Sequence, residues 1–237
     1  IGMDEHGQKV ARTAEAAGLA PQAFVDRIAE RFLSTWRALA ISNDQFIRTS
    51  AKAHHEAVQR LLEMIFEKNP DDFYERSYTG LYCVGCESFK PPADVVEGKC
   101  ALHPTRTLEE VTERNWFFRL SRYAPALKAH LAAHPEFLEP ATRRNEILAL
   151  LDQGLEDISA SRSRFAWGVP FPRPLSTGEA QTTYVWFDAL PNYWTAQFME
   201  GSRAQWPASV HVVGKDITRF HTVIWPAMLM AAGLPLP

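Results

Sequence analysis

Two pairs of potential metal ligands constrain the fold of this chain more than any other feature of its sequence. Cys83 and Cys86 have two residues between them, and Cys100 and His103 repeat this spacing further along. Each short pair closes around one side of a tetrahedral ion. Thiolate and imidazole ligands favour zinc over the hard cations. The sequence therefore predicts one Zn²⁺ site. Because four protein ligands leave no open position, the ion is expected to be structural rather than catalytic.

Two simpler interpretations of the same residues explain less. Buried free cysteines would have no reason to fall at paired spacing, and a redox-active Cys-x-x-Cys would leave the second pair unexplained. The chain holds three cysteines in all, within one short stretch, which makes a poor disulfide framework. This usage fits a metal site in a protein of the reducing cytoplasm.

The rest of the composition limits the classes of function. With 237 residues, 46% hydrophobic and 22% charged, the chain suits one large globular domain or two smaller ones. A formal net charge of −3 argues against a protein that coats nucleic acid through general basicity, although it is compatible with RNA binding through a local patch. We find no apolar run that would cross a bilayer and no signal peptide. Because the sequence starts at Ile1, we expect the natural protein to have a further N-terminal part.

Hydrophobic periodicity predicts helices in much of the chain. They are expected at residues 9–17, from Pro21 through Leu39, and at residues 51–68, 121–132 and 142–152. Gly18 stands where a helix C-cap is expected, and Pro21 at a first helical position. Between residues 73 and 115, β-prone and aromatic residues alternate with turn residues, which predicts short strands around the Cys/His pairs.

The last third of the chain has a different pattern. A strand is predicted at residues 182–187, with a helix starting at Asp188. A second, buried parallel strand is predicted at residues 210–213, followed by a helix that contains Trp225. Strand and helix thus alternate at both ends but not in the middle, which indicates an α/β domain interrupted by an insertion. We expect a first part at 1–72, an insertion at 73–157 and a second part at 158–237, with the two flanking parts sharing one mostly parallel sheet.

The two predicted strand-to-helix junctions carry aromatic and polar side chains. In α/β sheets, ligands bind beyond the carboxyl ends of the strands, so these side chains are candidates for a binding pocket. The candidates are Trp186 and Tyr193 at the first junction, and Asp216, Phe220, His221 and Trp225 at the second. Core packing would explain the large aromatic residues equally well. Asp4 lies in a further polar cluster, where helix capping is as good an explanation as ligand binding.

Taken together and in order, these segments resemble the methionyl-tRNA synthetases of the bacterial, one-zinc kind, across essentially the whole chain. The stretches that carry the resemblance are Gly2-Met3-Asp4-Glu5-His6-Gly7, Asp44-Gln45-Phe46-Ile47-Arg48-Thr49, Gly80-Leu81-Tyr82-Cys83-Val84-Gly85-Cys86, Arg144-Asn145-Glu146, Gly154-Leu155-Glu156-Asp157-Ile158-Ser159 with Ser161-Arg162, Trp186-Phe187-Asp188-Ala189, Gly214-Lys215-Asp216, Phe220-His221 and Trp225-Pro226. The resemblance implies a class I synthetase fold, in which a Rossmann-like catalytic domain is interrupted by a connective-peptide insertion that carries the zinc knuckle.

The resemblance also implies roles for individual residues. Asp4 would bind the methionine ammonium, and Gly214 and Asp216 would lie beside the adenylate. The side-chain pocket would be formed by Trp186, Ala189, Tyr193, Phe220, His221 and Trp225. The implied reaction activates L-methionine with ATP and Mg²⁺ and transfers it to tRNA(Met) in the cytoplasm, with neither DNA nor a membrane as a partner.

Some expected features of the family are not found in this sequence. The HIGH-type signature precedes the Asp4 segment in the family, and the KMSKS-type signature follows the end of this chain. These groups handle the phosphates, so the residues above describe half an active site, and this chain alone is expected to be inactive. Ala166 also stands where relatives often carry an acid, and the helical anticodon-binding domain is missing.

Two other functions stay open at this point. The first is a synthetase-like tRNA- or protein-binding module that has lost catalysis. The second is an unrelated zinc-knuckle RNA-binding module, which predicts a basic surface around residues 83–103. The charges counted against it are Lys90, Lys99 and Arg106, balanced by Glu87, Asp94 and Glu97.

Overall fold

The computed structural model describes residues 2–86, 88–90, 94–163 and 166–237. Glu87, one of the acidic residues counted near the Cys/His pairs, lies outside the described residues. The helices are α1 (Gln8–Ala16), α2 (Pro21–Ala38), α3 (Lys52–Lys68), α4 (Ala124–Ala133), α5 (Ala141–Gln153), α6 (Val185–Ala189), α7 (Asn192–Thr195) and α8 (Trp225–Ala232). The strands are β1 (Gly2–Met3), β2 (Ile47–Arg48), β3 (Phe73–Cys83), β4 (Ser88–Lys90), β5 (Val95–Val96), β6 (Lys99–Cys100), β7 (His103–Thr107), β8 (Glu109–Phe118), β9 (Ile158–Ser159), β10 (Ser161–Arg162) and β11 (Thr182–Thr183).

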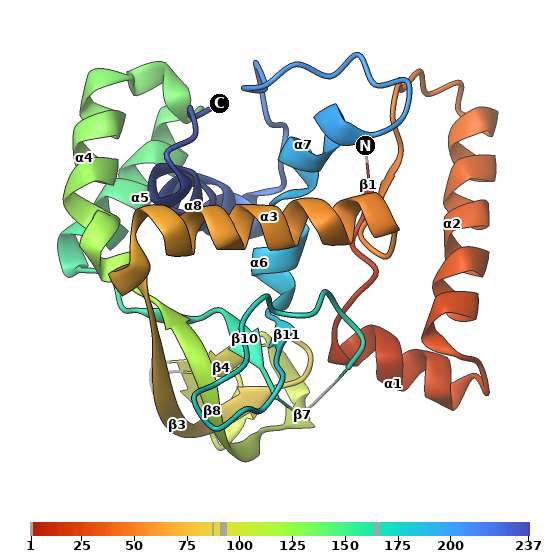
Figure 1. Ribbon diagram of the computed structural model, residues 1–237, viewed down its shortest axis with the longest axis horizontal. Helices are drawn as coiled ribbons and strands as arrows, with labels where there is room; N and C mark the ends of the chain where they lie inside the picture. Colours follow the sequence, from red (N-terminus) through yellow and green to blue (C-terminus); the bar gives the residue numbers. More distant parts are fainter. Residues whose placement is uncertain (1, 87, 91–93, 164–165) are drawn as a thin grey trace.

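Helix α3 crosses the middle of the molecule and carries much of its core (Figure 1). Val58, Leu61, Leu62 and Ile65 are fully buried at the three- and four-residue spacing that places them on one face of the helix. This face packs against α7 and α8. Helix α8 is buried on nearly every side, which is why its sequence is apolar throughout. Residues 52–68 and the last third of the chain therefore share one core.

The N-terminal helices are where periodicity predicts them. Helix α2 begins at Pro21, and Gly18 before it has a left-handed φ of 67°, which suits the end of α1. Strand β1 pairs parallel with β2, through Gly2 with Ile47 and Met3 with Arg48. Helix α2 stands at the edge of the molecule (Figure 1). These pairings place the segment after β1 beside the start of α3.

The segment predicted as an insertion, residues 73–157, is built on one long antiparallel ladder. Strands β3 and β8 pair from Phe73 with Phe118 to Tyr82 with Glu109. Strands β4 and β9 flank them in the order β4-β3-β8-β9, and β5, β6 and β7 form a separate three-stranded sheet. Helices α4 and α5 pack on each other beyond this sheet. Because β9 starts at Ile158, the sheet takes a strand from just past the predicted boundary at residue 157.

The predicted strand at residues 210–213 is wrong. None of the described sheets includes these residues, and the side chains of Val210 and Val212 are 74% and 94% exposed. A buried parallel strand needs hydrogen-bonded neighbours, and the described strands provide none here. The predicted strand at 182–187 is also shorter than expected. It ends at Thr183, and Trp186 and Asp188 lie on α6, because a short apolar run fits a strand and a buried helix equally well.

The expectation that the two flanking parts share a parallel sheet is likewise not met by the described residues. Only β1 and β2 form a parallel pair among the described strands, while β10 and β11 pair antiparallel. The flanking parts meet instead through α3 and its contacts with α7 and α8. Among the described helices, none combines the length and the apolar character that a bilayer span requires.

Candidate functional site

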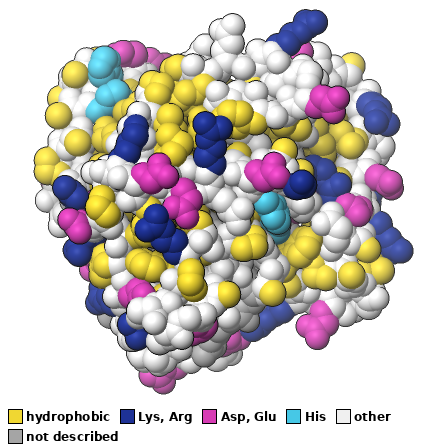
Figure 2. Space-filling model, in the orientation of Figure 1, with side chains coloured by type: hydrophobic (Ala, Val, Ile, Leu, Met, Phe, Trp, Pro, Cys, Tyr) yellow, Lys and Arg dark blue, Asp and Glu magenta, His cyan; other side chains and the backbone are white. Residues whose placement is uncertain are grey.

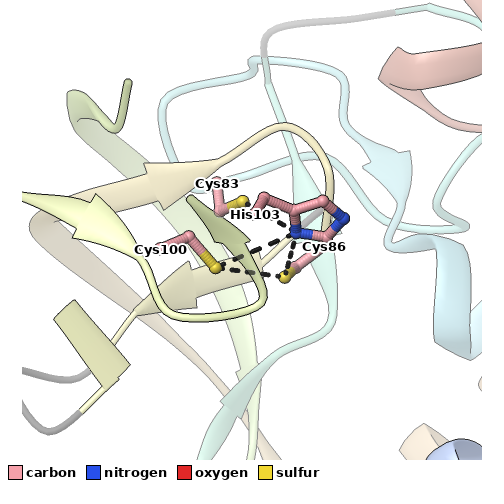
Figure 3. A group of neighbouring side chains, drawn as sticks. All are labelled: Cys83, Cys86, Cys100 and His103. Carbon is pink, nitrogen blue, oxygen red and sulfur yellow. Dashed lines mark hydrogen bonds between the residues drawn. The ribbon is translucent and has the colours of Figure 1, made fainter. Parts of the chain in front are cut away.

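The four predicted metal ligands converge in the insertion (Figure 3). Cys83 ends β3, Cys100 ends β6 and His103 begins β7, while Cys86 lies in the turn after β3. Their ligand atoms all lie within 4.8 Å of one another. The Cys86 and Cys100 sulfurs are 3.6 Å apart, and Nδ1 of His103 lies 3.2 Å from the Cys86 sulfur. Zinc bonds of ~2.3 Å at tetrahedral angles hold two sulfurs about 3.8 Å apart, so the cluster has the size and donor set of a zinc site.

The surroundings of the cluster also fit a cation. Burial raises the pKa of the Cys86 thiol to about 11, although the Lys90 ammonium opposes this shift. Burial acts against the thiolate of Cys100 too, but hydrogen bonds from His103 and the Leu102 backbone outweigh it and lower the pKa to about 6. A bound divalent ion would stabilise all three thiolates, because it places positive charge at the point where they meet.

Gly85 explains the tightness of this turn. A Cβ atom added at Gly85 would lie 2.7 Å from Cδ2 of the His103 ring and 2.8 Å from its Nε2. The imidazole therefore packs directly on the Gly85 backbone, and only glycine leaves room for it.

Three predicted pocket residues form one interlocked group. The Tyr193 hydroxyl lies 2.7 Å from Nε2 of His221, and Nδ1 of His221 lies 2.9 Å from the Ile217 carbonyl oxygen. A carbonyl only accepts, so Nδ1 carries the proton. Burial lowers the pKa of His221, which keeps the ring neutral, and Nε2 then accepts from Tyr193. The Tyr193 ring also lies 6.4 Å from that of Trp225.

The remaining pocket candidates flank this group. Trp186 stacks on Phe220 with ring centroids 3.6 Å apart and an interplanar angle of 11°. Phe220 is joined to His221 by a peptide bond, and both lie in the π-helical turn Phe220–Ile224. Such turns are frequent at functional sites, because they redirect side chains within a helix. Ala189 is buried at the end of α6.

The other predicted site residues lie at the surface. Asp4 follows β1 and is exposed, and Gly214 and Asp216 are exposed around the turn Lys215–Ile217. Helix capping by Asp4 is wrong, because the cap position of α1 is Gly7. The structure thus gathers the aromatic candidates and leaves the three candidates for the charged ends of the ligand exposed.

A cleft of about 960 Å³ opens beside His221. His211, Thr218 and Thr222 line one side of it, and residues of the insertion around His130 line the other. Among the predicted side-chain pocket residues, His221 is the one that lines this cleft.

The sequence patterns missed the most buried ionisable group in this region. Asp188 is wholly buried, with Oδ2 lying 2.5 Å from Nδ1 of His6 and Oδ1 lying 2.9 Å from Nε2 of His54. Burial alone would raise the pKa of Asp188, but the hydrogen bonds from His54 and His6 outweigh it and lower the pKa. His6 and Asp188 belong to segments that carry the family resemblance, but no role was predicted for either. His54 belongs to a predicted helix, and no role was predicted for it.

His211 was missed as well. Its ring stacks on Tyr193 with centroids 4.1 Å apart, and burial together with His221 lowers its pKa to about 4. His211 belongs to the predicted strand at 210–213, and no site role was predicted for it.

Comparison with known proteins matches this chain to one family. The family model described as tRNA synthetases class I (M) matches residues 1–107 and 92–237. The methionine–tRNA ligases of Thermosynechococcus vestitus and Streptomyces coelicolor are each 46% identical to this chain over 100% of its length. The chain covers 45% of each of them, so it spans about half the length of these relatives.

Solved structures give the same result. The Mycobacterium tuberculosis methionyl-tRNA synthetase bound by methionyl-adenylate superposes with a TM-score of 0.90 at 42% identity, covering 100% of this chain and 47% of that one. The free form of the same enzyme gives a TM-score of 0.78 at 41% identity over 91% of this chain and 44% of that one.

Proposed function

The chain belongs to the class I methionyl-tRNA synthetase family, and from this premise we propose that the whole protein is a methionine–tRNA ligase. It would use ATP with Mg²⁺ to convert L-methionine into methionyl-adenylate and would then charge tRNA(Met). The relatives named methionine–tRNA ligase support this proposal, as does the high similarity to a synthetase bound by methionyl-adenylate. Its place would be the cytoplasm, where three free cysteines stay reduced.

The observation that carries the proposal is the interlocked group of Tyr193, His221 and Trp225, with Trp186 and Phe220 beside it. A thioether is polarizable and packs well against aromatic rings, so such a group suits the methionine side chain. Tyr193 and His221 would add a polar edge near the sulfur. Ala189 at the end of α6 would complete the pocket.

The charged ends of the substrate need other groups. Asp4 would pair with the methionine ammonium, since a carboxylate is the natural partner of that cation. Gly214 and Asp216 would lie beside the adenylate. In the reaction, a methionine carboxylate oxygen bonds to the α-phosphorus of ATP while the bond to pyrophosphate breaks. A ribose hydroxyl of the tRNA end then displaces AMP. The groups that stabilise the phosphate charge would come from the two signatures that this chain lacks.

We also propose that Cys83, Cys86, Cys100 and His103 hold one structural Zn²⁺ ion. The donor set, the spacing of the four ligand atoms and the glycine beneath His103 support it. The ion would join the end of β3 to the sheet of β5, β6 and β7. The proposed division is a catalytic domain at 1–72 and 158–237, interrupted by the insertion at 73–157.

A test on the whole protein is methionine-dependent exchange of pyrophosphate into ATP. Asp4→Ala is expected to weaken activation about tenfold to a hundredfold, since a charge-assisted contact contributes ~1.5–3 kcal/mol. Trp225→Ala is expected to weaken it as well, because it removes a ring proposed to pack near the thioether, and to lower stability, because Trp225 is fully buried. Asp4→Ala should leave the fold nearly intact because Asp4 is exposed. Glu15→Ala, which removes another exposed carboxylate of the N-terminal segment, is the matched control.

The same assay separates the proposal from its alternatives. Wild-type protein without methionine-dependent exchange would favour a binding module that has lost catalysis. An RNA-binding zinc knuckle predicts a basic surface around residues 83–103, whereas Lys90 and Lys99 stand there beside Asp94 and Glu97. On the face of the molecule shown in Figure 2, Lys and Arg are likewise interspersed with Asp and Glu. Unchanged exchange kinetics in Asp4→Ala would show that the assigned ammonium partner is wrong.

A further inference from the structure

A buried hydrogen-bonded cluster joins four segments of the chain next to the proposed methionine pocket. It consists of Asp188 on α6, His6 in the segment after β1, His54 on α3 and Thr195 on α7, and we refer to it as the Asp188 cluster. All four residues are buried. Besides its two bonds to Asp188, His54 places Nδ1 3.0 Å from Oγ1 of Thr195.

For each histidine nitrogen that faces Asp188, the hydrogen-bond partner determines whether the nitrogen carries a proton. The Asp188 carboxylate accepts from Nδ1 of His6, and Nε2 of His54 lies 2.9 Å from both Oδ1 and the backbone oxygen of Asp188. All these partners are acceptors when the carboxylate is ionised, so both ring nitrogens carry protons. The hydrogen bonds also keep the pKa of Asp188 low. The cluster is therefore a buried anion held by two imidazole donors.

The His6 ring has little freedom to turn. The rings of His55 and Trp167 lie 5.1 Å and 5.2 Å from it, both edge-on. The Trp167 indole donates to the backbone oxygen of Glu5, at 2.7 Å. The segment that carries His6 is thus held by the hydrogen bond from Trp167 to its backbone, by the ring contacts of His6 and by the hydrogen bond from His6 to Asp188.

Three members of the cluster, His6, Asp188 and Thr195, lie close in sequence to a residue of the proposed pocket. Asp4 lies two positions before His6, and Tyr193 lies two positions before Thr195. Trp186 and Ala189 lie on the short helix α6 together with Asp188. Helix α3, which supplies His54, is anchored in the core and provides the rigid base (Figure 1).

From this arrangement we propose that Asp188, with His6 and His54, positions the methionine pocket: it sets the Asp4 segment on one side against α6 and α7 on the other. This inference rests on the proposed function. A buried charge is tolerated only in the arrangement that satisfies it. One relative placement of the segments meets that condition, so a loss of the charge would misplace the pocket residues as a group.

The chain contains a matched control for the loss of a buried charge. Asp72 is also wholly buried, and it pairs with Arg122 at 2.8 Å and with the Tyr123 hydroxyl. Asp72 lies just before β3, and its two partners lie just before α4. All three residues are therefore distant in sequence from the proposed pocket segments. Asp72→Asn therefore reports what a structural carboxylate contributes.

The experiment compares Asp188→Asn and Asp72→Asn in the whole enzyme. For Asp188→Asn we expect the KM for methionine in pyrophosphate exchange to rise about tenfold or more, with the KM for ATP and kcat within about twofold, the pattern of lost substrate binding. For Asp72→Asn we expect a lower Tm and an unchanged KM for methionine. A KM for methionine that is unchanged in both variants would show that the Asp188 cluster is only structural.

Rescue by conservative variants covers the case in which Asp188→Asn fails to fold. His6→Asn keeps a donor at the position of Nδ1, and His54→Gln keeps one at the position of Nε2. Both should retain most of the affinity for methionine, whereas His6→Ala and His54→Ala should raise the KM. Equal KM values in the alanine and the conservative variants would overturn the proposal. Absence of methionine-dependent exchange in the wild-type enzyme would instead contradict the proposed function itself.

Discussion

The His103 ring packs directly on the Gly85 backbone, so the proposed metal site depends on the absence of a side chain at residue 85. The ring fills the space where any other residue would carry its Cβ. Motif spacing predicts the four ligands but not this contact, because the contact depends on where the β7 strand returns relative to the turn. At the scale of single residues, the convergence of the four proposed ligands was therefore predictable, whereas the packing of His103 on Gly85 was not.

Gly85→Ala is expected to lower zinc affinity about tenfold to a hundredfold, the usual effect of disturbing the shell that orients a ligand. The added methyl group would push the His103 ring away from the three sulfurs. Competition with a chromophoric chelator measures the affinity. Leu102→Ala is the control, since that side chain lies between two ligands but is 75% exposed. Wild-type affinity in Gly85→Ala would mean that the ring can shift without loss of coordination.

The buried carboxylate of Asp188 gives stability a pH dependence with a definite sign. Its pKa is lower in the folded state than its ordinary value. The stabilisation is thus fully present above the ordinary pKa, about 3.9, and is lost as the pH falls through the lower folded-state pKa. The difference in free energy of unfolding between wild type and Asp188→Asn should be greatest above about pH 5 and should shrink below about pH 4. Urea denaturation across this range measures it, and a constant difference would contradict the assignment of charge.

At the scale of elements, the proposed insertion contains two sheets, of which one is stabilised by contact with the main core and the other is not. Strands β3 and β8 form a long ladder whose Phe73 and Phe118 enter the main core. Strands β5 and β6 have two residues each, and the cluster beneath them consists of Cys83, Cys100 and Leu108. Sheets this short gain too little from burial to persist alone.

Removal of zinc should therefore loosen the sheet of β5, β6 and β7 and leave the β3–β8 ladder protected near the core. Hydrogen exchange of backbone amides, with and without a chelator, measures both at once. Re-addition of zinc is the control and should restore protection to β6 and β7. Equal loss of protection along β3 and β8 would show that the metal supports the whole insertion.

Predictability at this scale follows the length and partners of each element. The helix at 51–68 was predicted within a residue of α3, because its apolar stripe is long. The helix at 9–17 was predicted within a residue of α1, and Gly18 marked its end. Short apolar runs gave two inaccurate strand predictions, at 182–187 and 210–213. The first run became mostly helix α6 and the second found no strand partner among the described residues.

The proximity of the residues of the proposed pocket could be predicted in part. The motif order identified Trp186, Tyr193, Phe220, His221 and Trp225, and contacts do join these aromatic residues in two adjacent groups. His54 and its bond to Asp188 could not be predicted, since a histidine on the apolar face of a helix has no sequence signal that separates a buried donor from a neutral core residue.

At the scale of the whole molecule, α3 joins parts of the chain that the insertion separates. Leu61 is fully buried in a core that also contains Phe118 and Leu151 from the insertion and Met228 from α8. Unfolding of either flanking part should therefore expose the same surface.

Leu61→Ala is expected to lower the free energy of unfolding by about 2–5 kcal/mol, the usual effect of a cavity in a rigid core. Glu63→Ala is the matched control on the same helix, because its ion pair with Arg173 is exposed and should contribute about 0–1 kcal/mol. Thermal and urea unfolding measure both. A loss below about 1 kcal/mol in Leu61→Ala would mean that the surrounding core collapses into the space.

The exposed valines of residues 210–213 have a practical consequence for handling the protein. Val210 and Val212 stand two positions apart in a segment that no described sheet includes, and their side chains are 74% and 94% exposed. Neighbouring exposed apolar side chains favour contacts between copies of a protein. We therefore expect samples of this chain to associate more as they are concentrated, and light scattering over a dilution series, run before any spectroscopic or calorimetric measurement, checks this.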